Sequence, residues 1–154
     1  MQRSTKAARV AHERADATPC HFRHRGRVLV ADDNADIRAL LTQLLEADGH
    51  VVVDVASGQE LLEVLAARTS TSWPEDAFDV IVTDDRMPNG HGLDAIERLR
   101  RAGCATPALL ITSFADESLR NRADDLETMV MCKPFPLPAF RTAVGVLLSL
   151  HAAA

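Results

Sequence analysis

Several short apolar runs in this chain end on side chains that could do chemistry. They are the carboxylates, hydroxyls and ammonium group of Asp32, Asp33, Asp84, Thr112, Ser113 and Lys133. Three carboxylates that meet at one place repel one another unless a cation lies between them. Oxygen ligands of this kind suit Mg²⁺, which is held by a few carboxylates together with a phosphoryl group. A lysine and a hydroxyl could contact the remaining phosphoryl oxygens, so the set predicts phosphoryl transfer to a carboxylate nucleophile.

Each of these side chains also has an ordinary structural explanation when it is considered alone. A pair of aspartates can stabilise a helix N-terminus, a threonine can cap a turn, and a lysine can simply lie on the surface. By the same reasoning we expect Asp85 to be a solvated loop acid and Cys132 to be a small buried hydrophobic residue. The functional interpretation is favoured because side chains suited to phosphoryl transfer follow four separate apolar runs, which is improbable by accident.

The elements that would position these residues follow from the apolar pattern, which alternates between strand and helix. β-branched or continuously apolar runs predict strands over residues 28–31, 51–55, 79–84, 108–111 and 129–132. Apolar residues at helical spacing predict helices between the strands, and a last helix over residues 138–151. Such alternation predicts a doubly wound, five-stranded parallel sheet, an α/β sandwich of the flavodoxin-like kind. The carboxyl ends of the strands lie at one edge of such a sheet, so the candidate side chains that follow them would lie close together.

Charge divides the chain into a basic leader and an acidic domain. Residues 1–27 hold seven Lys or Arg and two acids, a net charge of +5, whereas residues 28–154 hold ten and twenty, a net charge of −10. We expect a disordered tail over residues 1–26 and one domain over residues 27–151. The acidic domain argues against DNA binding. Three widely spaced cysteines, no secretory signal and no membrane-length apolar run predict a cytoplasmic protein without a membrane span.

Taken in order, the motifs closely resemble the receiver domains of two-component response regulators, from about Arg27 to Leu150. The resemblance is carried by Asp32-Asp33, Asp84-x-x-Met87-Pro88-x-x-x-Gly92, Thr112-Ser113 and Lys133-Pro134-Phe135. Each motif alone is weak, but four of them in this order are specific. One departure from the family pattern is Val130, which stands where an aromatic residue is often found, three residues before the lysine.

The resemblance implies a role for each acidic residue. Asp84 would be the phosphoacceptor, because it lies three residues before the methionine of the Met-Pro pair. Asp33 and Asp84 would bind Mg²⁺ directly, and Asp32 would act mainly through water. Arg86 would bind the ion through its backbone carbonyl.

The resemblance also implies the function. Thr112 and Lys133 would hold the phosphoryl oxygens, and the Lys133–Pro134 bond would be cis. The protein would be a signalling phosphoacceptor that catalyses only its own phosphorylation and dephosphorylation, with a sensor histidine kinase or phosphotransfer protein as its donor. Two alternatives stay open: a non-phosphorylated interaction module that keeps only the fold, and a Mg²⁺-dependent phosphatase. The phosphatase would need a second acid where Arg86 stands.

The last expected helix has more apolar surface than packing on a sheet requires. Between residues 138 and 151 its only charged side chain is Arg141, and apolar residues wrap more than one face. We expect the surplus around Val146 and Leu150 to be exposed and to mediate homodimerisation or to dock an output partner. The alternative is that the basic tail or the 69–76 loop covers it.

Overall fold

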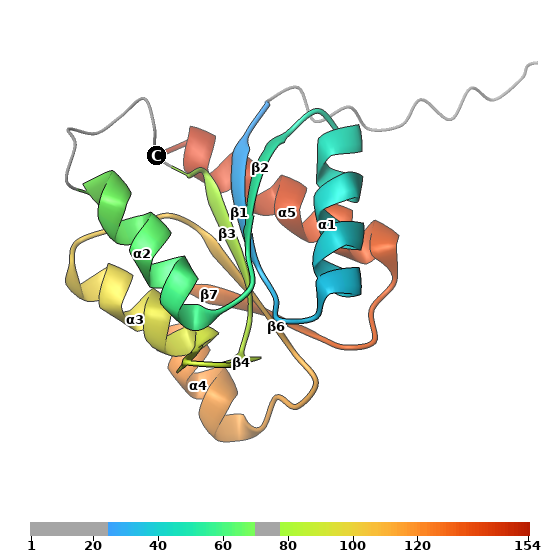
Figure 1. Ribbon diagram of the computed structural model, residues 1–154. Coiled ribbons are helices and arrows are strands. Elements are labelled where there is room, and N and C mark those ends of the chain that lie inside the picture. Colours follow the sequence, from blue (N-terminus) through green and yellow to red (C-terminus); the bar gives the residue numbers. More distant parts are fainter. Residues whose placement is uncertain (1–24, 70–77) are drawn as a thin grey trace, which may run out of the picture.

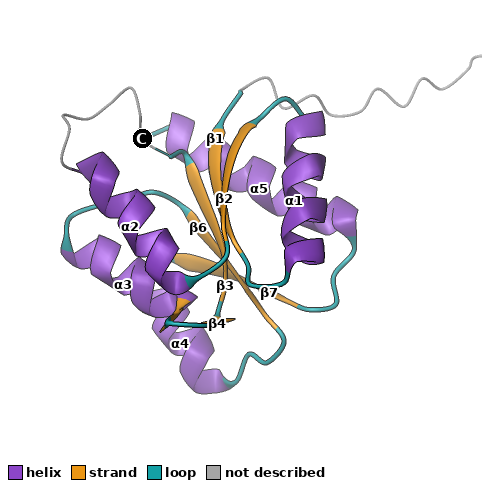
Figure 2. Cartoon of the chain, in the orientation of Figure 1, coloured by secondary structure: helices purple, strands orange, loops and turns teal. Residues whose placement is uncertain are grey.

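A computed structural model describes residues 25–69 and 78–154 of the chain. The expectations for residues 1–24 of the tail and for residues 70–76 of the loop lie outside this part. Five parallel strands form one sheet in the order β2-β1-β3-β6-β7, which confirms the predicted fold class (Figure 2). They are β1 (Arg27–Ala31), β2 (Val51–Val55), β3 (Val80–Asp84), β6 (Ala108–Thr112) and β7 (Thr128–Cys132).

Helices cover both faces of this sheet, as parallel strands with helical crossovers require. The helices are α1 (Ala35–Ala47), α2 (Gly58–Thr69), α3 (Gly92–Arg101), α4 (Glu117–Asp125) and α5 (Leu137–Ala152). Figure 1 shows α1 and α5 on one side and α2, α3 and α4 on the other. The sandwich therefore has three layers, with the strands in the middle.

Two apolar clusters hold the layers together, because successive residues of a strand point to opposite faces. Leu29 and Ile81 pack towards α2, α3 and α4, whereas Val28, Val30 and Val82 pack towards α1 and α5. Apart from the first residue of β1, every residue of the three central strands is buried. The carboxyl ends of β1, β3 and β6 are therefore fixed by a core on both sides.

N-terminal caps fix where two helices, α1 and α4, begin after the loops at the carboxyl edge of the sheet. The side chain of Asn34 accepts hydrogen bonds from the backbone of Asp36 and Ile37, so α1 begins directly after the acidic pair. The side chain of Asp116 accepts one from Leu119 and begins α4. Each cap satisfies backbone donors that would otherwise lack a partner, and each keeps the preceding loop short.

A small hairpin follows β3. Its strands are β4 (Arg86–Met87) and β5 (Gly90–His91), which pair antiparallel. The next residue, Gly92, begins α3 so close to the end of β3 that a Cβ atom there would collide with the carbonyl oxygen of Asp84. Only glycine permits this approach, which explains the glycine that ends the motif around Asp84.

The two ends of the described fold meet at the opposite edge of the sheet. The ring of His151, in the last turn of α5, lies 3.2 Å from the carboxylate of Asp79. That carboxylate also accepts a 2.7 Å hydrogen bond from the backbone of Arg27 at the start of β1. Next to it, Gly26 packs closely against the side chain of Leu148. The first residues of β1 and the last turn of α5 therefore lie side by side, at the edge of the sheet where the strands begin.

Helix α5 leaves the predicted apolar side chains uncovered. Val146 is 43 % exposed and Leu150 is 58 % exposed, while Phe140, Val144 and Leu147 are buried against the sheet. The exposure predicted from the sequence is confirmed. Among the helices of the described residues, none combines the length and the apolar character that crossing a membrane requires.

Candidate functional site

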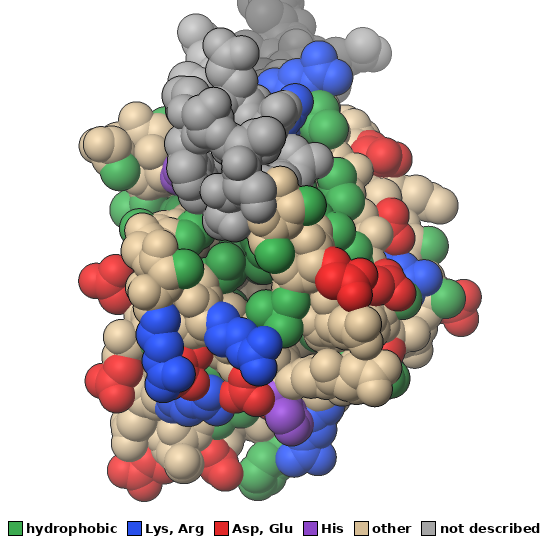
Figure 3. Space-filling model, turned by 60° about the vertical axis from the view of Figure 1, so that its left-hand side comes forward, with side chains coloured by type: hydrophobic (Ala, Val, Ile, Leu, Met, Phe, Trp, Pro, Cys, Tyr) green, Lys and Arg blue, Asp and Glu red, His purple; other side chains and the backbone are tan. Residues whose placement is uncertain are grey.

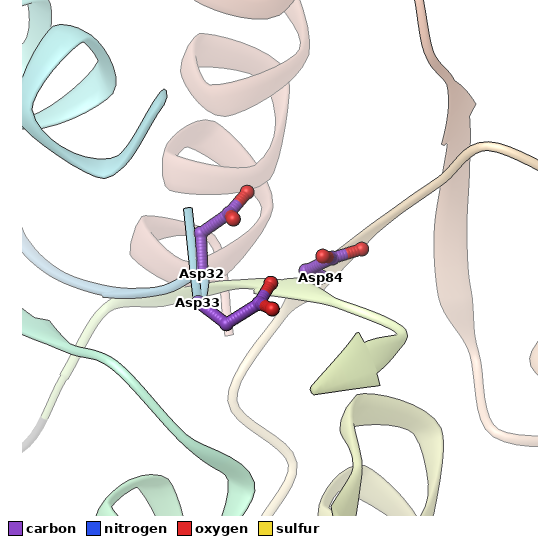
Figure 4. A group of neighbouring side chains, drawn as sticks. All are labelled: Asp32, Asp33 and Asp84. Atoms are coloured by element: carbon purple, nitrogen blue, oxygen red, sulfur yellow. The ribbon is translucent and has the colours of Figure 1, made fainter. Parts of the chain in front are cut away.

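Three carboxylates meet at the carboxyl edge of the sheet, as the sequence predicted. Asp32 and Asp33 follow the last residue of β1, and Asp84 is the last residue of β3, the strand that pairs with β1. One carboxylate oxygen of each lies within 4.8 Å of the others. Figure 4 shows the three side chains clustered around one space. Asp32 and Asp84 are buried, at 1 % and 9 % exposure, whereas Asp33 is exposed.

Lys133 supplies the positive charge that faces these acids. Its Nζ atom lies 3.2 Å from a carboxylate oxygen of Asp32 and 3.4 Å from one of Asp84. The lysine comes directly after β7, and its backbone N–H donates to the carbonyl of Thr112 at the end of β6. The Lys133–Pro134 peptide bond is cis, as expected. A single ammonium therefore bridges acids that arrive from two different strands.

Asp32 is held in place through both its backbone and its side chain. Its second carboxylate oxygen accepts a 2.9 Å hydrogen bond from the backbone of Asn34, and its carbonyl accepts one from the guanidinium of Arg38. These contacts orient the carboxylate towards Lys133. Asp33 has greater freedom because it is exposed, which leaves its carboxylate accessible to an ion from solvent.

The electrostatics of Asp84 reflect its burial. Removal from water raises the pKa of the Asp84 carboxyl above its ordinary value of 3.8, and the charge of Asp32 raises it further. Lys133 acts in the opposite direction, through its charge and its hydrogen bond, but does not cancel the effect of burial. A buried carboxylate beside another acid favours a further cation at this place, because the local negative charge is only partly balanced.

Thr112 occupies the expected place but points its hydroxyl into the following loop. The residue is 2 % exposed, and its Oγ1 both accepts from the backbone N–H of Phe114 at 3.2 Å and lies 3.1 Å from the carbonyl of Phe114. Its neighbour Ser113 is exposed. The predicted contact between Thr112 and phosphoryl oxygens stays a prediction, as does the part assigned to the carbonyl of Arg86.

The structure contradicts two of the expectations from sequence. Asp85 is only 7 % exposed, so it is not a solvated loop acid. It lines a pocket together with residues of the β4–β5 hairpin, α3 and α4, which a local sequence pattern does not reveal. Cys132 is exposed and lies 3.5 Å from the guanidinium of Arg120, so it is not a buried hydrophobic residue. The cysteine ends β7, an edge strand with only one neighbour in the sheet.

The acidic cluster fits a hard divalent cation. All three side chains offer oxygen, which Mg²⁺ prefers, and one of them is exposed to solvent, from which the ion would keep several waters. Among the described residues, this is the one group of three or more candidate ligands whose atoms lie this close together. Each of Asp32, Asp33 and Asp84 offers one oxygen to such an ion.

Comparison with known proteins points to one family. The family model described as the response regulator receiver domain matches residues 28–144. The transcriptional regulatory protein PdtaR of Mycobacterium tuberculosis is 32 % identical over 125 residues, which cover 77 % of this chain and 57 % of that protein. The virulence sensor protein BvgS of Bordetella bronchiseptica is 32 % identical over 136 residues, 82 % of this chain and 10 % of BvgS. The chain thus spans little more than half of the one and a tenth of the other.

Solved structures show the same fold. The receiver domain of the Francisella response regulator 1452 superposes with a TM-score of 0.71 at 23 % identity, covering 81 % of this chain and 98 % of that one. The chemotaxis protein CheY4 of Vibrio cholerae gives a TM-score of 0.68 at 24 % identity, with coverage of 80 % and 99 %.

Proposed function

The chain belongs to the receiver-domain family of two-component response regulators, and on that basis we propose that Asp84 accepts a phosphoryl group in a Mg²⁺-dependent reaction. The observation that carries the proposal is the bridge made by Lys133. One ammonium reaches both Asp32 and Asp84, and Asp33 stands at the solvent side of the same cluster. This arrangement has a nucleophile, a place for a cation and a fixed positive charge within a few ångströms.

The residues would act in the following way. A carboxylate oxygen of Asp84 forms a bond to phosphorus while the N–P bond of the donor phosphohistidine breaks. The electron pair of that bond stays on the imidazole, which takes up a proton. Lys133 then moves its hydrogen bond from the carboxylate to a phosphoryl oxygen, and Thr112 contacts another. A bound Mg²⁺ would neutralise charge on the acids and the phosphoryl oxygens, with Asp33 and Asp84 as its ligands.

The decisive experiment locates the adduct. Wild-type protein is incubated with Mg²⁺ and acetyl phosphate, the acyl phosphate is trapped with borohydride, and the modified residue is identified by mass spectrometry. We expect modification of Asp84, none after Asp84→Asn, and undiminished labelling after Asp85→Asn. An adduct on Asp85 would refute the assignment, absence of any adduct would favour the non-phosphorylated interaction module, and rapid catalytic turnover of acetyl phosphate would favour the phosphatase.

We further propose that the phosphoryl donor docks beside α1. A groove of about 390 Å³ lies between α1 and the segment after β7, and Lys133 forms part of its wall. Its other lining side chains are mainly apolar, among them Ile37, Phe135 and Leu40, which is 47 % exposed. Because the groove opens at the residue that bridges the acids, a helical phosphotransfer protein or histidine kinase seated there would present its phosphohistidine to Asp84.

This docking proposal has a clean test because acetyl phosphate needs no protein contact. Leu40→Lys should slow phosphorylation by a phosphotransfer domain that labels the wild type, and should leave labelling by acetyl phosphate unchanged. Leu150→Lys, which replaces a comparably exposed leucine on α5, serves as the control and should affect neither donor. Equal effects of Leu40→Lys on both donors would place the defect in the site and contradict the proposal.

The output of the domain is proposed to lie on β6, α4 and α5. Phosphorylation would bias a two-state equilibrium of β6, α4 and α5, and the exposed apolar side chains of α5 would contact a second copy of the chain or an output partner. The support is the exposure of Val146 and Leu150 on a helix that is otherwise packed on the core. A cytoplasmic location goes with this proposal, because the donor and the Mg²⁺ would meet the domain there.

A further inference from the structure

A second acid beside the proposed phosphorylation site has no partner for its charge. Asp85 is only 7 % exposed. Its backbone is fixed, because its N–H donates to Ile111 and its carbonyl accepts from Gly92. Within the described residues, however, the carboxylate itself makes no ion pair and accepts no side-chain hydrogen bond. Charged side chains are seldom this little exposed without a partner, so this one calls for an explanation.

Asp85 lines a pocket of about 330 Å³ whose lining includes none of the three clustered acids. The pocket is bounded by the β4–β5 hairpin, by α3, and by α4 with the loop before it. Apolar surface comes from Leu93 and Leu119, and Phe114, which is 62 % exposed, stands beside them. Its volume is at the lower end of the range of about 300–1,000 Å³ for small-molecule sites, which suits one long side chain or a small ligand.

Arg122 and Asp116, two other charged residues of the pocket, are already engaged. Arg122 lies 2.5 Å from Asp94 and 2.6 Å from Glu97, so its guanidinium joins α4 to α3 and is balanced by two acids. Asp116 accepts from the backbone at the start of α4. Figure 3 shows basic and acidic side chains side by side on this face.

Arg86 also lines the pocket, but it is exposed, and within the described residues it makes no ion pair. Asp85 is thus the little-exposed acid of the pocket whose carboxylate has no partner among the described residues.

We propose that this pocket binds the cationic side chain of a docking partner, an arginine or a lysine. The guanidinium or ammonium would pair with Asp85, its methylene stem would lie along Leu93 and Leu119, and the ring of Phe114 would add a cation–π contact. A metal ion is a poorer fit, since Asp85 belongs to no close group of three ligands among the described residues. The proposal does not depend on phosphorylation of Asp84.

The test uses capped amino acids as probes of the folded, full-length chain. N-acetyl-arginine amide and N-acetyl-lysine amide are titrated into ¹⁵N-labelled protein, and N-acetyl-citrulline amide serves as the uncharged match for arginine. We expect saturable amide shifts at Leu93, Leu119 and Phe114 with the two cations and none with citrulline. Asp85→Asn should weaken binding by about tenfold or more, as loss of a charge-assisted hydrogen bond does. Added NaCl should weaken it as well.

A second variant tests the charge of the pocket without replacing Asp85, in case Asp85→Asn disturbs the fold. Ser118→Lys leaves Asp85 in place and adds a positive charge at the pocket, which Ser118 also lines; it should weaken probe binding similarly, whereas Ser118→Gln should not. Binding that is equal in wild type and Asp85→Asn, or that citrulline reproduces, would overturn the proposal. Tighter Asp85-dependent binding of putrescine than of either capped amino acid would overturn the assignment to a partner side chain, and would indicate a free amine.

Discussion

Replacing Lys133 by methionine should unfold the metal-free protein more easily and should matter far less once Mg²⁺ is bound. Methionine keeps most of the length of the lysine side chain and removes only its charge. In the metal-free protein this charge faces Asp32 and Asp84, at 3.2 and 3.4 Å. Without it, two buried carboxylates from neighbouring strands are left to repel each other with no cation between them.

The magnitude follows from these distances. Each contact is worth about 5 kcal/mol at an effective dielectric constant of about 20, and the cost of taking the ammonium out of water offsets much of this. Removing one partner of a buried ion pair typically costs about 3–5 kcal/mol. Because the Lys133 side chain is 18 % exposed, we expect a loss near the lower figure. For a chain of this length that lowers Tm by roughly 6–12 °C.

The assay is thermal unfolding of wild type and Lys133→Met in EDTA and in saturating Mg²⁺. A divalent ion at the acids replaces the missing charge, so the difference should shrink to less than about 1 kcal/mol with Mg²⁺. Arg141→Met breaks the exposed ion pair with Asp48, whose Nε–Oδ2 distance is 2.7 Å, and should have little effect in either condition. A loss that is the same with and without Mg²⁺, or no loss at all, would refute the role of Lys133 as counter-ion.

Four further outcomes are expected. Asp33→Asn should weaken Mg²⁺ binding by at least about tenfold in calorimetry without lowering stability in EDTA, and destabilisation there would count against repulsion among the acids. Because the pKa of Asp84 is raised in the fold, its stabilising contribution is complete below pH 3.8 and is lost as pH rises through the folded value. Asp84→Asn should therefore stabilise the metal-free protein at pH 7 and not at pH 3, and equal curves at pH 7 would contradict this. The backbone N–H of Phe114 donates to Thr112, the proposed contact of a phosphoryl oxygen, so Phe114→Ala should speed hydrolysis of the acyl phosphate severalfold by admitting water, measured as loss of label after donor removal; an unchanged lifetime would show that the ring does not limit access. Replacing Val146 and Leu150 together by lysine should shift the protein towards monomer in sedimentation while sparing phosphorylation, and a wild type that is monomeric with and without beryllofluoride would end the dimer hypothesis.

Some of the site can be predicted from the sequence because local patterns of apolar residues and motif spacing are enough to place it. Apolar runs at strand and helix spacing indicate a parallel sheet, and residues that follow its strands must lie at one edge. The motif spacing of Asp32, Asp84 and Lys133 is therefore sufficient to place these three residues together. The orientation of the Thr112 hydroxyl towards Phe114 depends on the loop geometry that follows, and the sequence contains no signal for it.

The two wrong predictions concern burial by distant parts of the chain. Asp85 was expected to be a solvated loop acid, but it lies in a pocket whose other walls, the hairpin and two helices, come later in the sequence. Cys132 looked buried because it ends an apolar run, but that run is an edge strand. The exposure of Cys132 depends on the position of its strand in the sheet, and the residues of a strand do not show which strands lie beside it.

The meeting of β1 and α5 at the amino edge has a practical consequence for handling the molecule. Because His151 and Arg27 both contact Asp79, anything joined to either end of the described fold is attached at the edge remote from the acids. A fluorescent protein, an affinity tag or a tether to a sensor surface should leave the carboxylates and the α1 groove open to a soluble partner (Figure 1). Surface-based binding measurements can therefore use either end as the point of attachment.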